Sequence, residues 1–261
     1  MRVVQITDPH VTATGTLRAD AIDTGQRFKA ALDHCRTLDP APDLVLLTGD
    51  LANDARADEY AAVAAIIDAL PADMPPMALL PGNHDDRAAL CRLAENWRFA
   101  PDYNATDFVQ TAIDPGGGLP VVLMLDSLVD GATEGRLCAR RLVWVGERLT
   151  HAANRPVIIA MHHPPFVPTI MPGQPACEGT DALAALLARH GGLIGSLSGH
   201  LHRPMAATFC GASSWVGPST AYRLPLAQTT DDLQRAAGER VCYAVHDWSP
   251  QTGLRSAEIV V

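Results

Sequence analysis

Lysine is almost absent from this sequence. Nineteen of its twenty basic side chains are arginine, and Lys29 is the exception. Because alanine is also abundant, we interpret this as a compositional bias, so an arginine is not by itself evidence of a phosphate-binding site. The formal net charge of −9 argues against a surface that binds long nucleic acid, for which basic patches are expected. It does not exclude a small anionic substrate, because bound metal ions can reverse the local charge.

A C-x-x-C pair and a long apolar run are also missing. The six cysteines are scattered, which predicts reduced, buried thiols and no disulfide scaffold. No apolar run reaches the length of a membrane-spanning helix, and no charged and apolar leader precedes the first predicted strand. We therefore expect a cytoplasmic protein that does not associate with a membrane.

The apolar residues that are present predict an α/β fold. The sequence has 261 residues, of which 48% are hydrophobic, enough for a sizeable core. Short unalternated runs rich in Val, Ile and Leu are typical of strands buried on both faces, and they occupy residues 3–6, 44–47, 77–80, 121–125 and 157–161. Helices are predicted between them at 24–36 with Thr24 as N-cap, 56–70, 140–152 and 180–189. This alternation indicates βαβ crossovers.

The pattern changes after residue 205. Residues 213–216, 240–246 and 256–261 are predicted as further strands. Residues 218–238 have no clear periodicity and are interpreted as a cap, an arm or an oligomer contact. No repeat or linker divides the sequence, so we predict one domain over residues 1–261, with 205–261 as its C-terminal strands.

Five short blocks of metal-binding residue types stand out, four of them directly after predicted strands. They are Asp8-Pro9-His10, Gly49-Asp50, Gly82-Asn83-His84-Asp85, His162-His163 and Gly199-His200-Leu201-His202. Sites in open α/β sheets form beyond the carboxyl ends of strands, so we expect the blocks to converge. In extended chain, residues two apart face the same side, so the D-x-H and H-x-H blocks should each present two ligands. The glycine that precedes a ligand in three blocks predicts a sharp turn or a close backbone approach.

The residue types indicate a catalytic centre with two metal ions. Mixed carboxylate, imidazole and amide ligands suit Mn, Fe, Zn or Co better than Ca, and the lack of cysteine argues against a closed structural zinc site. Side chains of these types occur in all five blocks. A carboxylate such as Asp50 can bridge two ions, which would hold a hydroxide nucleophile and stabilise in-line displacement at phosphorus.

Several polar residues near the blocks have other predicted or open roles. His84 is the histidine least needed as a ligand, and we expect it to hydrogen-bond the phosphoryl group or protonate the leaving alkoxide. Four other polar residues have two open roles: they either orient metal ligands through hydrogen bonds or serve in ordinary turns and packing. They are His163, Asn53, Asp85 and Ser127. The loop 166–178 either walls the substrate pocket or is a plain surface loop. The remaining histidines, interpreted as incidental, are His34, His151, His190 and His246.

The blocks resemble those of the calcineurin-like metallophosphoesterase superfamily, D-x-H, G-D, G-N-H-[DE], H and G-H-x-H, over residues 8–202. His162-His163-Pro164-Pro165 and the block at 82–85 are most similar to bacterial class III cyclic-nucleotide phosphodiesterases and related glycerophosphodiesterases. The resemblance implies a four-layer α/β/β/α sandwich, often dimeric or larger. It also implies a first metal held by Asp8, His10, Asp50 and His202. A second metal would be held by Asp50, Asn83, His162 and His200, with Asp50 bridging and His84 acting on the substrate.

Two branches of that superfamily are disfavoured. Ser/Thr protein phosphatases carry Asp-Arg-Gly soon after the G-D block and usually Glu after G-N-H, whereas this chain has Leu51-Ala52 after Asp50 and Asp85 after His84. Purple acid phosphatases place a tyrosine ligand three residues after the bridging Asp, where this chain has Asn53.

We therefore predict a dinuclear metal-dependent phosphodiesterase that hydrolyses a small diester, such as a cyclic nucleotide or a glycerophosphodiester, as a homodimer or larger homo-oligomer. A phosphomonoesterase or a nucleotide pyrophosphatase would use the same metal core. A nuclease would too, but the acidic charge argues against it. A non-catalytic scaffold with this fold would be expected to have lost ligands, and this chain has lost none.

Overall fold

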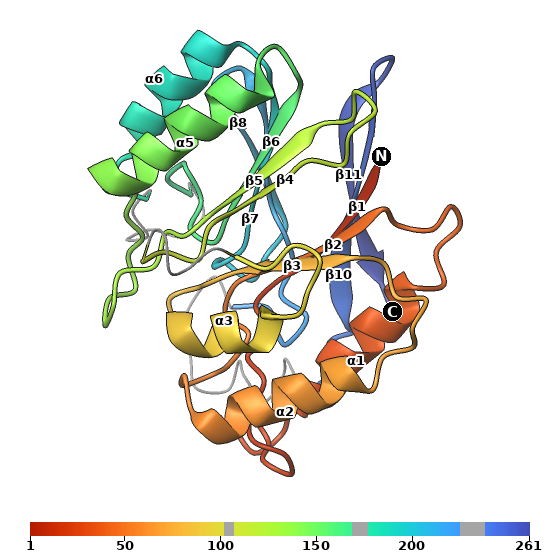
Figure 1. Cartoon of the computed structure of the whole chain (residues 1–261). Coiled ribbons are helices and arrows are strands. Elements are labelled where there is room, and N and C mark those ends of the chain that lie inside the picture. Colours follow the sequence, from red (N-terminus) through yellow and green to blue (C-terminus); the bar gives the residue numbers. More distant parts are fainter. Residues whose placement is uncertain (102–106, 169–176, 225–237) are drawn as a thin grey trace.

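Two β-sheets lie at the centre of the structure, and helices cover their outer faces (Figure 1). The computed structural model describes all residues except 102–106, 169–176 and 225–237. The first sheet contains Arg2–Ile6 (β1), Leu44–Thr48 (β2), Met77–Leu80 (β3), Cys242–Ser249 (β10) and Gly253–Val260 (β11), in the order β11-β10-β1-β2-β3. The second contains Thr111–Ile113 (β4), Val121–Leu125 (β5), Val157–Met161 (β6), Leu193–Ser198 (β7), Met205–Phe209 (β8) and Ala212–Val216 (β9), in the order β4-β5-β6-β7-β9-β8.

The helices form the two outer layers. On the first sheet lie Thr24–Cys35 (α1), Ala57–Asp68 (α2) and Arg87–Ala94 (α3). On the second sheet lie Ala139–Ala152 (α5) and Thr180–His190 (α6). Among the described helices, none combines the length and the hydrophobicity needed to span a bilayer.

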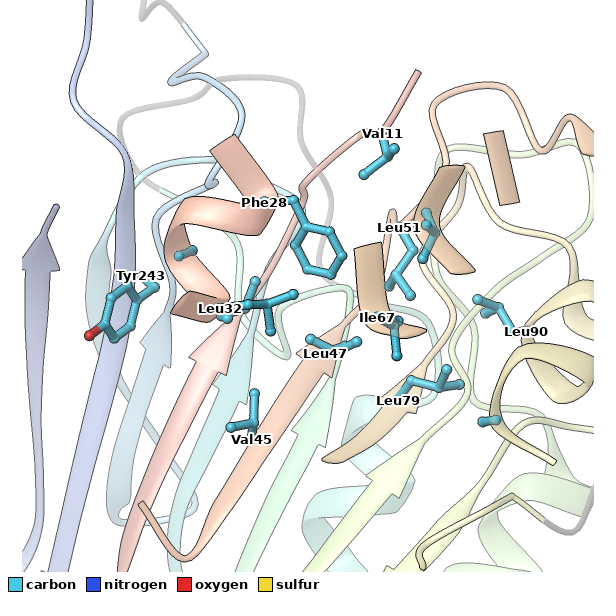
Figure 2. Close-up of a cluster of buried hydrophobic side chains, with 14 of the residues drawn as sticks. Val11, Phe28, Leu32, Val45, Leu47, Leu51, Ile67, Leu79, Leu90 and Tyr243 are labelled. Atoms are coloured by element: carbon cyan, nitrogen blue, oxygen red, sulfur yellow. The ribbon is translucent and has the colours of Figure 1, made fainter. Parts of the chain in front are cut away.

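Three apolar layers hold the sheets and helices together. Val45 and Leu47 of β2 pack with Phe28 of α1 beneath the first helical layer (Figure 2). Leu44 and Leu46 point the other way, into the layer between the two sheets. A third layer lies between the second sheet and helices α5 and α6. Because both faces of the central strands are buried, their sequences are continuously apolar. The predicted four-layer α/β/β/α sandwich is confirmed.

The predicted elements agree with the structure except in a few places. The five predicted N-terminal strands and the four predicted helices each end within two residues of their predicted bounds. The N-cap of α1 is Asp23, whose carboxylate accepts the Gln26 N–H at 2.9 Å, so the prediction of Thr24 is wrong. Strands β4, β7 and β8 and helix α3 were not predicted. In β7, Gly195 and two serines interrupt the apolar pattern, although most of the strand is buried.

The strand directions bring the five blocks to one edge. Strands β1, β2 and β3 are parallel, and so are β5, β6, β7 and β9. The blocks follow β1, β2, β3, β6 and β7, at their carboxyl ends.

A polar network crosses the apolar layer between the sheets. The Gln5 side-chain amide donates to the Ser198 carbonyl oxygen at 2.8 Å and to the Thr48 hydroxyl at 2.9 Å. Its oxygen accepts from His246 Nε2 at 3.1 Å, and His246 Nδ1 accepts from the Ser256 hydroxyl at 2.7 Å. Burial lowers the pKa of His246 to about 3. His246 is therefore a neutral, hydrogen-bonded part of the core.

His246 should make the stability depend on pH. Since its pKa is about 3 in the folded chain and 6.5 ordinarily, only the unfolded chain gains a proton as the pH falls below 6.5. The stability that this group contributes is present above pH 6.5 and is lost as the pH falls toward 3. We expect the free energy of unfolding of the wild type, relative to that of His246→Gln, to drop by about 2 kcal/mol between pH 8 and pH 5.

Urea denaturation at several pH values measures this difference. The exposed His151, substituted in the same way, is the control and should leave the pH dependence unchanged. A difference between wild type and His246→Gln that stays constant from pH 8 to pH 5 would contradict a buried neutral imidazole.

Candidate metal centre

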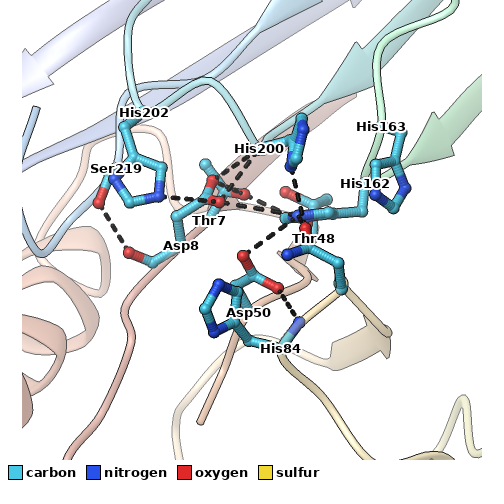
Figure 3. Close-up of polar contacts among 12 residues, drawn as sticks. Thr7, Asp8, Thr48, Asp50, His84, His162, His163, His200, His202 and Ser219 are labelled. Carbon is cyan, nitrogen blue, oxygen red and sulfur yellow. Dashed lines mark hydrogen bonds and ion pairs between the residues drawn. The ribbon is translucent and has the colours of Figure 1, made fainter. Parts of the chain in front are cut away.

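The five blocks converge at the carboxyl ends of the strands, as predicted (Figure 3). Ligand atoms of one group of residues all lie within 4.8 Å of one another, and this group consists of Asp8, His10, Asp50 and His202. Beside it, the Asn83 amide oxygen lies 2.9 Å from His200 Nδ1 and 3.2 Å from His162 Nε2. His162 Nε2 is 3.3 Å from Asp50 Oδ2, which links the two groups. The structure thus brings all seven predicted ligand residues together.

The centre is deep on one side and open on the other. Asp8, Asp50 and His162 are almost entirely buried, and so are His10 and His202. The residues Asn83, His84 and His200 are only partly buried. A substrate would therefore enter past these three side chains.

The ligand residues have an unusual backbone conformation. Five of them are left-handed, with φ values of 50° at Asp8, 42° at His10, 54° at Asp50, 70° at His200 and 56° at His202. The expectation that extended chain would align the residues two apart is therefore wrong, although each pair does face the same cluster. Tight left-handed turns aim the side chains inward, and such strain is concentrated at functional sites.

The glycines before the ligands are required by close packing. Gly49 has φ of 95°, and a Cβ there would overlap His162 Nδ1. A Cβ at Gly82 would overlap Asp50 Oδ1, and one at Gly199 would overlap the Thr7 hydroxyl. The predicted close approach is confirmed at all three positions.

The protonation of the histidines suits metal binding. Burial lowers the pKa of His10 and His202, and it lowers that of His200 to about 3, so their imidazoles are neutral. His162 differs. Burial opposes its protonation, but the charges of Asp50 and Asp8 raise its pKa to about 9. A metal ion would replace that proton, because a metal binds the neutral imidazole.

Backbone carbonyl groups orient two of these rings. The Thr48 carbonyl oxygen lies 2.9 Å from His162 Nδ1, and the Tyr222 carbonyl oxygen lies 2.9 Å from His202 Nδ1. Each Nδ1–H therefore donates to a carbonyl, which leaves Nε2 free to bind a metal. His10 Nε2 and His202 Nε2 face each other at 3.0 Å, beside the two carboxylates. Lone pairs that converge in this way, from carboxylate, imidazole and amide groups, fit two transition-metal ions.

His84 lies at the edge of this cluster. Its backbone N–H donates to Asp50 Oδ1 at 2.8 Å, and its Nδ1 lies 2.5 Å from the Asn53 carbonyl oxygen. Its ring meets that of His10 edge-on, with centroids 4.7 Å apart. Because Nδ1–H donates to the carbonyl, Nε2 is the nitrogen that remains for a substrate.

Asp85 connects two ligand turns. Its carboxylate accepts the Leu51 N–H at 3.1 Å, the Ala52 N–H at 3.2 Å and the Gly82 N–H at 3.0 Å. The Tyr60 hydroxyl also donates to it at 3.2 Å. Burial and the charge of Asp50 raise the pKa of Asp85 to about 6. Of the roles left open by the sequence, orientation of the ligand turns fits these contacts.

His163 lies beside the metal cluster, and one of its ring nitrogens is within 4.8 Å of a ring nitrogen of His162 and of His200. Its Nδ1 lies 2.8 Å from the Ser127 hydroxyl, and its Nε2 lies 3.1 Å from the Thr133 carbonyl oxygen. Both ring nitrogens are thus engaged, even though the His163 ring packs against those of His162 and His200. These contacts favour a packing role over a ligand role.

Three residues that contact the centre were not predicted from the sequence. Thr7 donates to Asp8 Oδ2 at 2.6 Å, and Ser219 donates to the Asp8 carbonyl oxygen at 2.7 Å. Ser219 and Tyr222 come from the segment 218–238, whose residues 218–224 lie beside the predicted metal ligands. Residues 225–237 of that segment and residues 169–176 of the loop 166–178 lie outside the described residues. Thr7 could have been found from its place next to Asp8, but the sequence has no signal for Ser219 or Tyr222.

Comparisons with known proteins agree with this geometry. The family model for calcineurin-like phosphoesterases matches residues 1–204. A probable glycerophosphodiester phosphodiesterase from Arcobacter nitrofigilis is 27% identical over 257 residues, covering 97% of this chain and 91% of the relative. A probable cyclic nucleotide phosphodiesterase from Rhodococcus erythropolis is 32% identical over 247 residues, covering 94% of this chain and 79% of the relative.

Solved structures show the same fold. A dimetal phosphatase from Danio rerio superposes with a TM-score of 0.70 at 14% identity, covering 100% of this chain and 98% of that one. A purple acid phosphatase from yellow lupin has a TM-score of 0.58 at 16% identity, covering 94% of this chain and 49% of that one. Since the family model and the relatives extend over most of its length, the chain belongs to the calcineurin-like phosphoesterase family.

Proposed function

We propose that this chain is a dinuclear metal-dependent phosphodiesterase that hydrolyses a small phosphodiester. The position of Asp50 is the observation that carries the proposal. Asp50 Oδ2 lies 3.4 Å from His10 Nε2 in one ligand group and 3.3 Å from His162 Nε2 in the other. A carboxylate between two sets of ligands is placed to bridge two ions.

The residues divide into two ligand sets. One ion would be held by Asp8, His10, Asp50 and His202, and the other by Asp50, Asn83, His162 and His200. We infer Mn, Fe, Zn or Co from the mixture of oxygen and nitrogen ligands. When bound, two such ions neutralise phosphoryl oxygens and lower the pKa of a water molecule for in-line attack.

The chain's own residues orient the ligands and supply a proton. Thr7 and the His200 N–H, at 3.0 Å, fix the Asp8 carboxylate. His84 Nε2 would donate a proton to the leaving oxygen as the bond from phosphorus to that oxygen breaks. The Asn53 carbonyl group holds the His84 ring in the orientation that this transfer requires.

The names of the relatives and the net charge of the chain support a small phosphodiester as the substrate. Both curated relatives described above carry names of phosphodiesterases, one for glycerophosphodiesters and one for cyclic nucleotides. The net charge of −9 favours a small substrate over long nucleic acid. A cytoplasmic location and a homodimeric state stay predictions.

The proposal predicts a preference for diesters over monoesters. With Mn²⁺, bis(p-nitrophenyl) phosphate should be hydrolysed with a higher kcat/KM than p-nitrophenyl phosphate, because a diester is the expected substrate. Release of p-nitrophenol measures both rates. A clear preference for the monoester would favour a phosphomonoesterase and overturn the proposal.

Asp50→Ala should abolish activity and lower the metal content, because both ligand sets lose a member. Metal analysis after dialysis should find fewer than two ions per chain. The exposed Asp54 of the same loop offers a matched control, and Asp54→Ala should keep two ions. Two retained ions in Asp50→Ala would contradict the bridging role.

His84→Ala should keep both ions but lower kcat by about 10²–10⁴-fold on an alkyl diester, whose leaving alkoxide needs a proton. The loss should be much smaller on bis(p-nitrophenyl) phosphate, because p-nitrophenolate leaves without one. His151→Ala, at an exposed histidine of α5, is the control. Loss of metal from His84→Ala would make His84 a ligand, and equal losses on both substrates would exclude the acid role.

A further inference from the structure

A cavity of about 360 Å³ lies beside the candidate metal centre. Residues from the turn after β1 line one side, and residues from the turn after β2 line the other, among them Thr12, Arg18, Asn53 and Arg56. The Asn53 carbonyl group that orients His84 belongs to this wall. Because His84 is expected to protonate the leaving oxygen, the cavity lies on the side of the leaving alcohol.

Arg18 is the cation of this cavity that has no carboxylate partner among the described residues. Its Nε atom is buried without a hydrogen-bond partner. The guanidinium donates a hydrogen bond to the Tyr222 hydroxyl and is close enough to His10 for its charge to act on that ring. Burial is the largest cause of the raised pKa of Tyr222, and the charge of Arg18 acts against it by favouring the ionised hydroxyl. Burial is also the largest cause of the lowered pKa of His10, and there the charge of Arg18 acts in the same direction, because it favours the neutral ring.

The backbone holds Arg18 in place. The Arg18 N–H donates to the Ile22 carbonyl oxygen at 2.8 Å, and the Ile22 N–H donates back at 3.0 Å. Ile22 is buried against Ala221 and Tyr222, the segment that also orients His202. Arg18 therefore projects from an anchored turn, as a residue that recognises a substrate should.

Of the other charged groups of the cavity, Arg56, Asp58 and Glu59 have partners. Arg56 pairs with Asp58 at 3.0 Å. The Glu59 carboxylate accepts the backbone N–H groups of Asp54 at 2.8 Å and Arg56 at 3.1 Å. Asp54 is exposed to solvent. These contacts leave Arg18 as the positive charge available to a ligand.

We propose that Arg18 binds a second anionic group, carried by the leaving alcohol of the diester. The inference rests on the proposed function and narrows it to diesters whose leaving arm has its own negative charge. The scissile phosphate does not need Arg18, because the metal ions and His84 meet its charge. A guanidinium suits a carboxylate or phosphate because it can bind either with two parallel hydrogen bonds.

Two glycerophosphodiesters that differ by one carboxylate test the proposal. In sn-glycero-3-phosphoserine the leaving alcohol carries a carboxylate, and in sn-glycero-3-phosphoethanolamine it does not. We expect the wild type to have the higher kcat/KM on the serine diester. In Arg18→Gln the ratio of kcat/KM values, serine over ethanolamine, should fall about ten- to a hundredfold, mainly through KM, which is typical for loss of a charged hydrogen bond.

Control variants show whether the change in the ratio of kcat/KM values is specific to Arg18. Arg36→Gln removes an arginine from the far end of α1, where it pairs with Asp73, and should leave the ratio unchanged. Arg18→Lys should restore part of the ratio, and all variants should keep two metal ions per chain.

The outcomes distinguish this proposal from the proposed function. Equal losses on the two diesters in Arg18→Gln, loss of metal from that variant, or a wild type without preference for the serine diester would overturn the role of Arg18. If the enzyme hydrolysed bis(p-nitrophenyl) phosphate or a cyclic nucleotide but neither glycerophosphodiester, the role of Arg18 would also be overturned. The phosphodiesterase proposal would stand in that case. Failure to hydrolyse any of these diesters would overturn both.

Discussion

Burial of two carboxylates is the constraint on which the rest of the site depends. Asp8 is fully buried and Asp50 is 2% exposed, at the ends of the adjacent parallel strands β1 and β2. An ionised carboxylate is stable there only if cations or hydrogen-bond donors surround it. Backbone N–H groups of His84 and His200 supply part of that compensation, and imidazoles supply another part. A pair of metal ions would complete it, which is why the ligand histidines crowd so closely around the two acids.

The same constraint explains the backbone strain. To aim two side chains from one short turn into a small space, Asp8 and His10 both take positive φ, and so do His200 and His202. Each such residue costs roughly 1–2 kcal/mol, which the three apolar layers must offset. Asp85 ties the turn that follows Asp50, which also has positive φ, to the Gly82 turn through contacts with the N–H groups of Leu51, Ala52 and Gly82. The sandwich therefore acts as a rigid frame for turns that would not be stable alone.

The fold and the convergence of the predicted ligand residues could be predicted because their signals are local. Apolar runs buried on both faces mark β1, β2, β3, β5 and β6, and each block lies beside the strand that positions it. Strand β7 was missed because Gly195 and its serines interrupt the pattern. The left-handed backbone at Asp8 was missed because an Asp gives no signal that separates this conformation from extended chain. Ser219 and Tyr222 were missed for another reason: they reach the site only through tertiary packing.

Chemistry and specificity are therefore encoded differently in this chain. The predicted metal ligands lie next to strand ends, so short motifs in the sequence reveal them. The proposed recognition of the leaving group depends on Arg18, whose turn is held in place by the packing of Ile22 against Ala221 and Tyr222. With nineteen arginines in the sequence, composition could not single out Arg18. What singles it out is its position: an anchored guanidinium without a carboxylate partner in the described structure, in a cavity that is also lined by Asn53, whose carbonyl group orients His84.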